Sequence, residues 1–129
     1  MAGSDPSHWL YRLTAGEWLA AAHNELARAR AALVDKQHRA GVTQARRAAG
    51  MAWNAWMINH RASEDRYGRS YMDHLKVLCH DEAVTHEVRA AAQALCDAKL
   101  MSELVQLGPG STELADAALV ILKFSEPVR

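Results

Sequence analysis

Alanine is the residue that most constrains the fold of this chain. It occurs 25 times in 129 residues, whereas glycine occurs seven times, proline three times and phenylalanine once. Alanine has the highest helix propensity of any residue and is depleted in β-strands. β-branched residues are sparse, and no segment alternates polar and apolar residues with the period of two that marks a half-buried strand. The chain is therefore predicted to be all-α.

Apolar residues recur at helical spacing in five segments, which are expected to be helices over 15–36, 44–61, 71–80, 84–106 and 112–124. Thr14 and Glu17 have the spacing of a capping box at the first of these helices. Thr43 is expected to cap the second, after a turn at 37–41, and residues 62–69 are expected to form a loop. Gly108-Pro-Gly110 is a strong stop before the last helix, which Ser111 or Thr112 would cap.

Short connections favour antiparallel neighbours, so the predicted architecture is an up-and-down bundle of four long helices plus one short helix. The length suits one domain over 1–129, with an irregular lead-in at 1–13 and a frayed tail at 125–129. Within the second helix, four alanines form one stripe (Ala45, Ala48, Ala52, Ala55). Trp53 and Trp56 lie beside it. A helix this apolar is either central to the bundle or part of a dimer interface.

The formal net charge is zero, which argues against a general binder of nucleic acid or of membrane surfaces. The charge is nevertheless uneven, because residues 28–47 are strongly basic and residues 97–126 are acidic. One interpretation is a set of solvated faces. The other is a phosphate-contacting tip, with Arg39, Arg46 and Arg47 as the contacts, or self-association between opposite charges. A separate hypothesis is a small-ligand or nucleotide pocket between helices, with Trp53 or Trp56 stacking on a base.

Several classes of protein are disfavoured. No apolar run reaches the roughly 18 residues of a membrane span, and the first residues lack the pattern of a signal peptide. Cys79 and Cys96 do not make a disulfide framework, so reduced thiols in a cytoplasmic protein are expected. His74, Cys79, His80 and His86 fit no standard zinc site. No metal or cofactor is therefore predicted, and Asp81 and Glu82 are interpreted as first-turn residues favoured by the helix dipole.

Arg69 and His74 form the spacing Arg-x4-His at an expected loop-to-helix junction. A histidine can act as general acid or base near neutral pH, and an arginine can stabilise the extra charge of a phosphorane-like transition state. The pair is therefore a candidate for RNA cleavage. The alternative is that His74 packs at the seam between its helix and the bundle and that Arg69 is a surface charge.

The order of helices and the alanine pattern resemble the HEPN domains, a family of small α-helical bundles. The second helix of that family repeats Ala-x-x-Ala-Ala, which is similar to the segment Gln44–Ala52 here, and a short helix opening on His-x-Leu is similar to His74-Leu75 with Leu78. The likeness covers residues 14–124. Active members are metal-independent RNases with Arg-x4–6-His near the start of the last long helix, whereas Arg69 and His74 lie at the start of a short one.

The resemblance thus implies a member without the RNase motif in its usual place. It also implies a homodimer, often beside a nucleotidyltransferase-like partner in toxin–antitoxin or defence settings. The function expected from the sequence is a non-catalytic, dimeric helical bundle that acts as an interaction module or binds nucleotide or RNA. The alternative is a metal-independent RNase that uses Arg69 and His74.

Overall fold

The computed structural model describes residues 9–61, 64–99 and 112–127, and over these residues the regular structure is entirely helical. A short 3-10 helix, η2 (Trp9–Arg12), precedes six α-helices: α1 (Ala15–Val34), α2 (His38–Asn59), α3 (Glu64–Tyr67), α4 (Tyr71–Leu78), α5 (His86–Asp97) and α6 (Glu113–Ser125). The prediction of an all-α bundle is confirmed. Within the described ranges, no helix combines the length and the hydropathy needed to cross a membrane.

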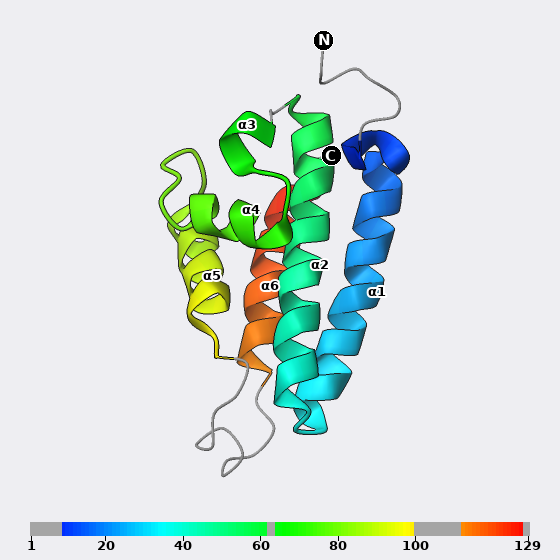
Figure 1. The fold of residues 1–129 in the computed structure, drawn as a ribbon, viewed down its shortest axis with the longest axis vertical. Coiled ribbons are helices and arrows are strands. Elements are labelled where there is room, and N and C mark those ends of the chain that lie inside the picture. The colour runs from blue at the N-terminus through cyan, green and yellow to red at the C-terminus, as the bar shows by residue number, and fades with distance from the viewer. Residues whose placement is uncertain (1–8, 62–63, 100–111, 128–129) are drawn as a thin grey trace.

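Helix α2 is the centre of the bundle. In Figure 1, α1 runs downward, α2 returns upward beside it, α5 descends and α6 rises, while the short α4 lies across the front. Helices α1, α4, α5 and α6, together with η2, all contact α2. Its alanine stripe (Ala45, Ala48, Ala52, Ala55) and Trp53 have no exposed surface. The apolar face that could have formed a dimer interface is therefore covered within one chain.

Side-chain caps fix the beginnings of three helices. The Thr14 hydroxyl accepts the amide of Glu17, and the Glu17 carboxylate accepts the amide of Thr14, which confirms the predicted capping box of α1. Ser70 accepts the amide of Asp73 at α4, and Thr85 accepts the amide of Val88 at α5. These contacts satisfy amides that would otherwise lack partners in the first turn of each helix.

The turn between the first two helices is shorter than predicted. It needs only residues 35–37, because Lys36 takes a left-handed conformation (φ 59°) and the Gln37 amide bonds to the Ala32 carbonyl. Helix α2 therefore begins at His38, and Thr43 lies inside it rather than at its cap. Gly41 is not a turn glycine: a Cβ there would lie 2.4 Å from a Leu33 methyl, so its role is to let α1 and α2 approach.

Two further boundaries differ from the prediction. The expected loop at 62–69 contains the four-residue helix α3, which lies close to α4. The helix expected over 84–106 ends at Asp97, where Ala98 turns to an extended conformation (φ −60°, ψ 132°). The rest of that range, Gly108-Pro-Gly110 and Ser111 lie outside the described residues. Thr112 precedes α6 as expected, although its side chain makes no capping bond.

Candidate functional site

His74 lies at the junction of α2, α3 and α4 and has no exposed surface. Its Nδ1 is 2.7 Å from the carbonyl oxygen of Tyr67, and its Nε2 is 2.8 Å from Oδ1 of Asn54. Burial lowers the pKa of His74, and the Tyr67 carbonyl and the charge of Asp73 offset this only in part. Both ring nitrogens are thus engaged by protein groups, and the neutral imidazole is favoured at neutral pH.

The hydrogen bonds of His74 also define its tautomer. A carbonyl oxygen can only accept, so Nδ1 carries the proton, and Nε2 of the neutral ring must accept. Asn54 would then donate from its amide nitrogen, which as placed has no partner among the described residues. Turning the amide over pairs that nitrogen with Nε2. In this arrangement His74 joins three helices by hydrogen bonds, as the packing alternative for this residue predicts.

Arg69 does not share a surface with His74. Its side chain is exposed in the connection between α3 and α4, whereas His74 is enclosed by the same corner. A substrate on the surface could contact Arg69, but it could reach the imidazole only if this corner opened. In this arrangement the His74 imidazole is not accessible to a substrate at the surface.

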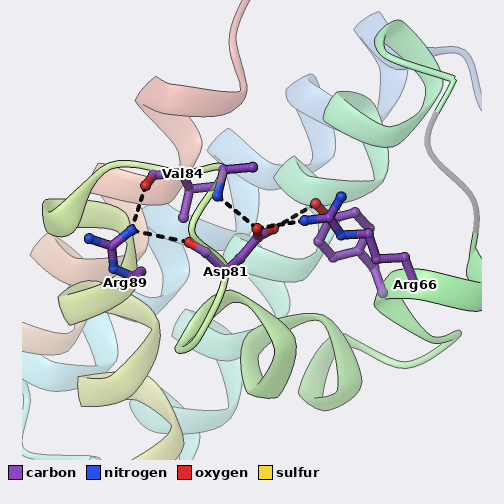
Figure 2. A network of polar contacts seen from close by, with 6 residues as sticks. Arg66, Asp81, Val84 and Arg89 are labelled. Carbon is purple, nitrogen blue, oxygen red and sulfur yellow. Dashed lines mark hydrogen bonds and ion pairs between the residues drawn. The ribbon is translucent and has the colours of Figure 1, made fainter.

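A buried carboxylate, Asp81, holds the same corner together (Figure 2). It accepts hydrogen bonds from Nη2 of Arg66 at 2.6 Å, from the Tyr67 hydroxyl at 2.7 Å and from the Ala83 amide at 2.9 Å. Arg89 of α5 donates to the main-chain carbonyls of Asp81 and Val84. Asp81 thus ties α3 to the α4–α5 connection. It precedes the cap of α5, so its interpretation as a first-turn residue is wrong.

The hydrogen bond between Asp81 and Tyr67 shifts the pKa values of both groups, in opposite directions. Burial alone would raise the pKa of Asp81, but hydrogen bonds from Tyr67 and Ala83 and the charge of Arg66 hold it below its usual 3.8. Burial, and then the hydrogen bond to Asp81, raises the pKa of Tyr67 to about 12. Asp81 is therefore ionised and Tyr67 neutral at neutral pH. These roles are structural, since the carboxylate is almost fully enclosed.

The three predicted phosphate-binding arginines do not converge. Arg46 donates to the carbonyl oxygens of Leu95, Cys96 and Ala98, where it covers the C-terminal end of α5. Arg47 forms an ion pair at 3.0 Å with the buried carboxylate of Glu25 on α1. Arg39 is exposed in the first turn of α2. Two of the three guanidinium groups are thus engaged in holding helices together.

The two tryptophans belong to an aromatic stack that runs from the core towards the surface. Trp53 is buried between Phe124 of α6 (ring centroids 6.0 Å apart) and Trp56 (4.3 Å, interplanar angle 8°). Trp56 is half-buried and stacks in turn on His60 at 4.2 Å and 12°. His60 is exposed, and its Nδ1 is bonded to the Trp56 carbonyl. The stack therefore ends in an aromatic ring held at the surface.

Sequence reasoning missed His60, although its spacing of four residues from Trp56 places both on one helix face. The stack and Arg39 lie at opposite ends of α2, roughly 25 Å apart at a rise of 1.5 Å per residue. Tyr67 packs edge-on against Trp53 and Trp56, and the guanidinium of Arg66 lies 5.2 Å from the Tyr67 ring centroid. In the described part of the chain, no three His, Cys, Asp or Glu side chains gather as a metal site.

Comparison with protein-family models, with curated proteins and with solved structures finds no match to this chain.

Proposed function

We propose that this chain is a non-catalytic, HEPN-like helical bundle that binds a nucleobase, in a nucleotide or in RNA, at the Trp56–His60 end of its aromatic stack. The observation that carries the proposal is the His60 ring, stacked on Trp56 and fixed by a hydrogen bond to the Trp56 carbonyl. A ring that is already oriented loses little conformational entropy when a ligand stacks on it. A base could extend the stack by one more ring.

The surroundings of His60 suit such a ligand. Arg61 follows directly and is exposed, and the side chain of Arg66 is 56% exposed at the neighbouring Tyr67. Positive charge beside a stacking ring is the combination by which proteins bind single-stranded nucleic acid without strict sequence preference. The charge of Arg66 is partly balanced by Asp81, so stacking supplies most of the affinity in this proposal.

The non-catalytic part of the proposal depends on His74. A general acid or base must come within hydrogen-bond distance of the reacting group, and His74 is enclosed with both nitrogens occupied.

The proposal keeps the homodimer and the nucleotidyltransferase-like partner that the HEPN resemblance implies. Any such interface would use a surface other than the apolar face of α2. Light scattering on a size-exclusion column at micromolar concentration tests the dimer, and a clean monomer would contradict it.

The binding proposal is tested by titrating the protein with adenosine monophosphate and with a short single-stranded RNA while tryptophan fluorescence is recorded. His60→Ala should weaken binding about 5- to 150-fold, since stacking on an aromatic side chain contributes roughly 1–3 kcal/mol per base. His86→Ala, at an exposed histidine on α5, is the matched control and should leave the dissociation constant unchanged.

Two results would contradict the proposal. One is a fluorescence titration without change for both ligands, or an equal affinity of the His60→Ala and wild-type proteins. The other is cleavage of the RNA by the wild-type protein that is lost in His74→Gln, which would favour the RNase alternative. Circular dichroism of each variant excludes unfolding as the cause of weaker binding.

A further inference from the structure

Two cysteines from different helices lie side by side at the α4–α5 corner. Cys79 is the C-terminal cap of α4, and Cys96 lies in the last turn of α5. Their sulfur atoms are 3.6 Å apart although 17 positions separate them in the sequence. Both thiols are free and half-buried. The two thiols are therefore within hydrogen-bonding distance of each other.

The positions of the two residues leave room for a covalent bond. A disulfide needs the sulfurs at about 2.05 Å, so the pair must close by roughly 1.5 Å. Both residues lie at helix ends, where the main chain can move more easily than in a helix centre. The main chain leaves the helical conformation close to each of them, in the turn at Cys79 and His80 and in the extended residue Ala98, two positions after Cys96.

We propose that Cys79 and Cys96 are a modification site at which hydrogen peroxide forms an intramolecular disulfide between α4 and α5. Cys96 attacks one peroxide oxygen and becomes a sulfenic acid, while the other oxygen leaves as water. The sulfur of Cys79 then displaces the oxygen of the sulfenic acid, which also leaves as water with the Cys79 proton. In sum, two thiols and one peroxide give one disulfide and two water molecules.

The surroundings of Cys79 indicate which of the two thiols reacts first with peroxide. Burial, and then the neighbouring Cys96 sulfur, raises the pKa of Cys79 to about 12. Its thiol also lies 3.1 Å from the Leu75 carbonyl, to which it donates. Cys79 is thus a protonated thiol at neutral pH, and the thiolate is the form that attacks peroxide. Because the Cys79 thiol is held by the Leu75 carbonyl, we assign the first attack to Cys96, with Cys79 as the resolving thiol at contact distance.

The disulfide would enclose the Asp81 network. The loop between the two cysteines contains Asp81 and Arg89, which already connect the α4–α5 segment to α3 and to α5. A covalent bond across this loop restricts the unfolded chain, which stabilises the folded state provided that the folded geometry is not strained. Oxidation is therefore expected to raise the midpoint of thermal unfolding.

Peptide mapping of the whole protein tests the proposal directly. Trypsin is expected to release residues 77–89 and 90–99 as separate peptides, each with one cysteine. After treatment with hydrogen peroxide and digestion without reductant, the two peptides should appear joined, with two hydrogen atoms fewer than their sum. Treatment with a reductant should separate them. The thermal midpoint should rise on oxidation and return on reduction.

Single substitutions provide the controls. Cys79→Ser should leave Cys96 to form a sulfenic acid that dimedone traps, whereas Cys96→Ser should leave Cys79 unmodified at the same peroxide concentration. The proposal is overturned if the wild-type peptides stay separate while a small dithiol in the same solution is oxidised. It is also overturned if the disulfide forms only between two copies of the chain. Both outcomes are read from the wild-type protein, so they hold even if a variant fails to fold.

Discussion

The substitution Asp81→Asn is expected to lower stability substantially, because this carboxylate accepts three hydrogen bonds in an enclosed position. The ion pair with Arg66 contributes little, since that arginine side chain is 56% exposed and such pairs are worth about 0–1 kcal/mol. The bond from the Tyr67 hydroxyl is buried and the bond from the Ala83 amide is partly buried. A hydrogen bond to a charged group contributes roughly 1.5–3 kcal/mol, and the asparagine keeps one acceptor oxygen.

The free energy of unfolding should therefore fall by about 2–4 kcal/mol. For a chain of this size, about 3–5 °C of thermal midpoint corresponds to each kcal/mol, so a decrease of roughly 10 °C is expected. Urea unfolding followed by circular dichroism measures the free energy. Glu82→Gln, at the exposed neighbouring carboxylate, is the matched control and should change it by less than about 0.5 kcal/mol.

The effect of Asp81→Asn should depend on pH in a defined direction. The pKa of Asp81 is depressed below 3.8 in the folded protein, so its stabilisation is complete above that value. The stabilisation is lost as the pH falls through the folded pKa. The pKa of Tyr67 is raised to about 12, mainly by burial and then by Asp81. The stability from the neutral phenol is complete below pH 10 and is lost as the pH rises towards 12.

The difference between the wild-type and Asp81→Asn proteins should therefore be largest near neutral pH and should narrow in acid and in alkali. A variant as stable as the Glu82→Gln control would refute the assignment of Asp81 as the residue that holds this corner together. A difference that stays constant from pH 6 down through the titration of Asp81 would refute the electrostatic explanation.

Two further substitutions separate packing from binding. Gly50→Ala should lower the free energy of unfolding by about 1–3 kcal/mol despite the better helix propensity of alanine, because its Cβ would lie 2.2 Å from the Tyr71 ring. Adding Tyr71→Ala to that variant should remove most of the loss caused by the clash between the two residues. Losses that simply add in urea unfolding would contradict this explanation. Arg46→Ala should lower the free energy of unfolding by about 1–2 kcal/mol, because carbonyl oxygens at the end of α5 lose their hydrogen bonds to the guanidinium. The same variant should bind RNA as tightly as the wild type. Weaker binding by the folded variant would support Arg46 as a phosphate contact.

Local patterns in the sequence were sufficient for three of the six α-helices that the structure describes. The boundaries of α1, α4 and α6 follow from apolar spacing, and those of α1 and α4 also from caps that involve residues only three positions apart. The burial of the alanine stripe on α2 also follows from spacing. The prediction was wrong where a boundary depends on a distant contact. Gly41 was interpreted as a turn residue because its contact with Leu33 of the preceding helix cannot be seen from composition.

The candidate site was less predictable for the same reason. Whether a histidine is a catalyst or a packed core residue depends on its burial and partners, and for His74 these come from α2 and α3. No sequence pattern distinguishes the buried Asp81 from the exposed Glu82, because the partners that hold Asp81, Arg66 and Tyr67, lie about 15 positions away in the chain. Arg46 and Arg47 likewise gain their structural roles from α5 and α1.

The central place of α2 has a consequence for how the protein opens. Amide hydrogens exchange with solvent when a segment unfolds locally, and the cost rises with the apolar surface that the opening exposes. Helix α3 has four residues and can separate once its contacts with Asp81 and His74 break and the Tyr67 side chain leaves the core. Helix α2 cannot, because α1, α4, α5 and α6 all contact it. Its amides should therefore exchange only when the whole molecule unfolds, which makes α2 the last segment to lose its structure.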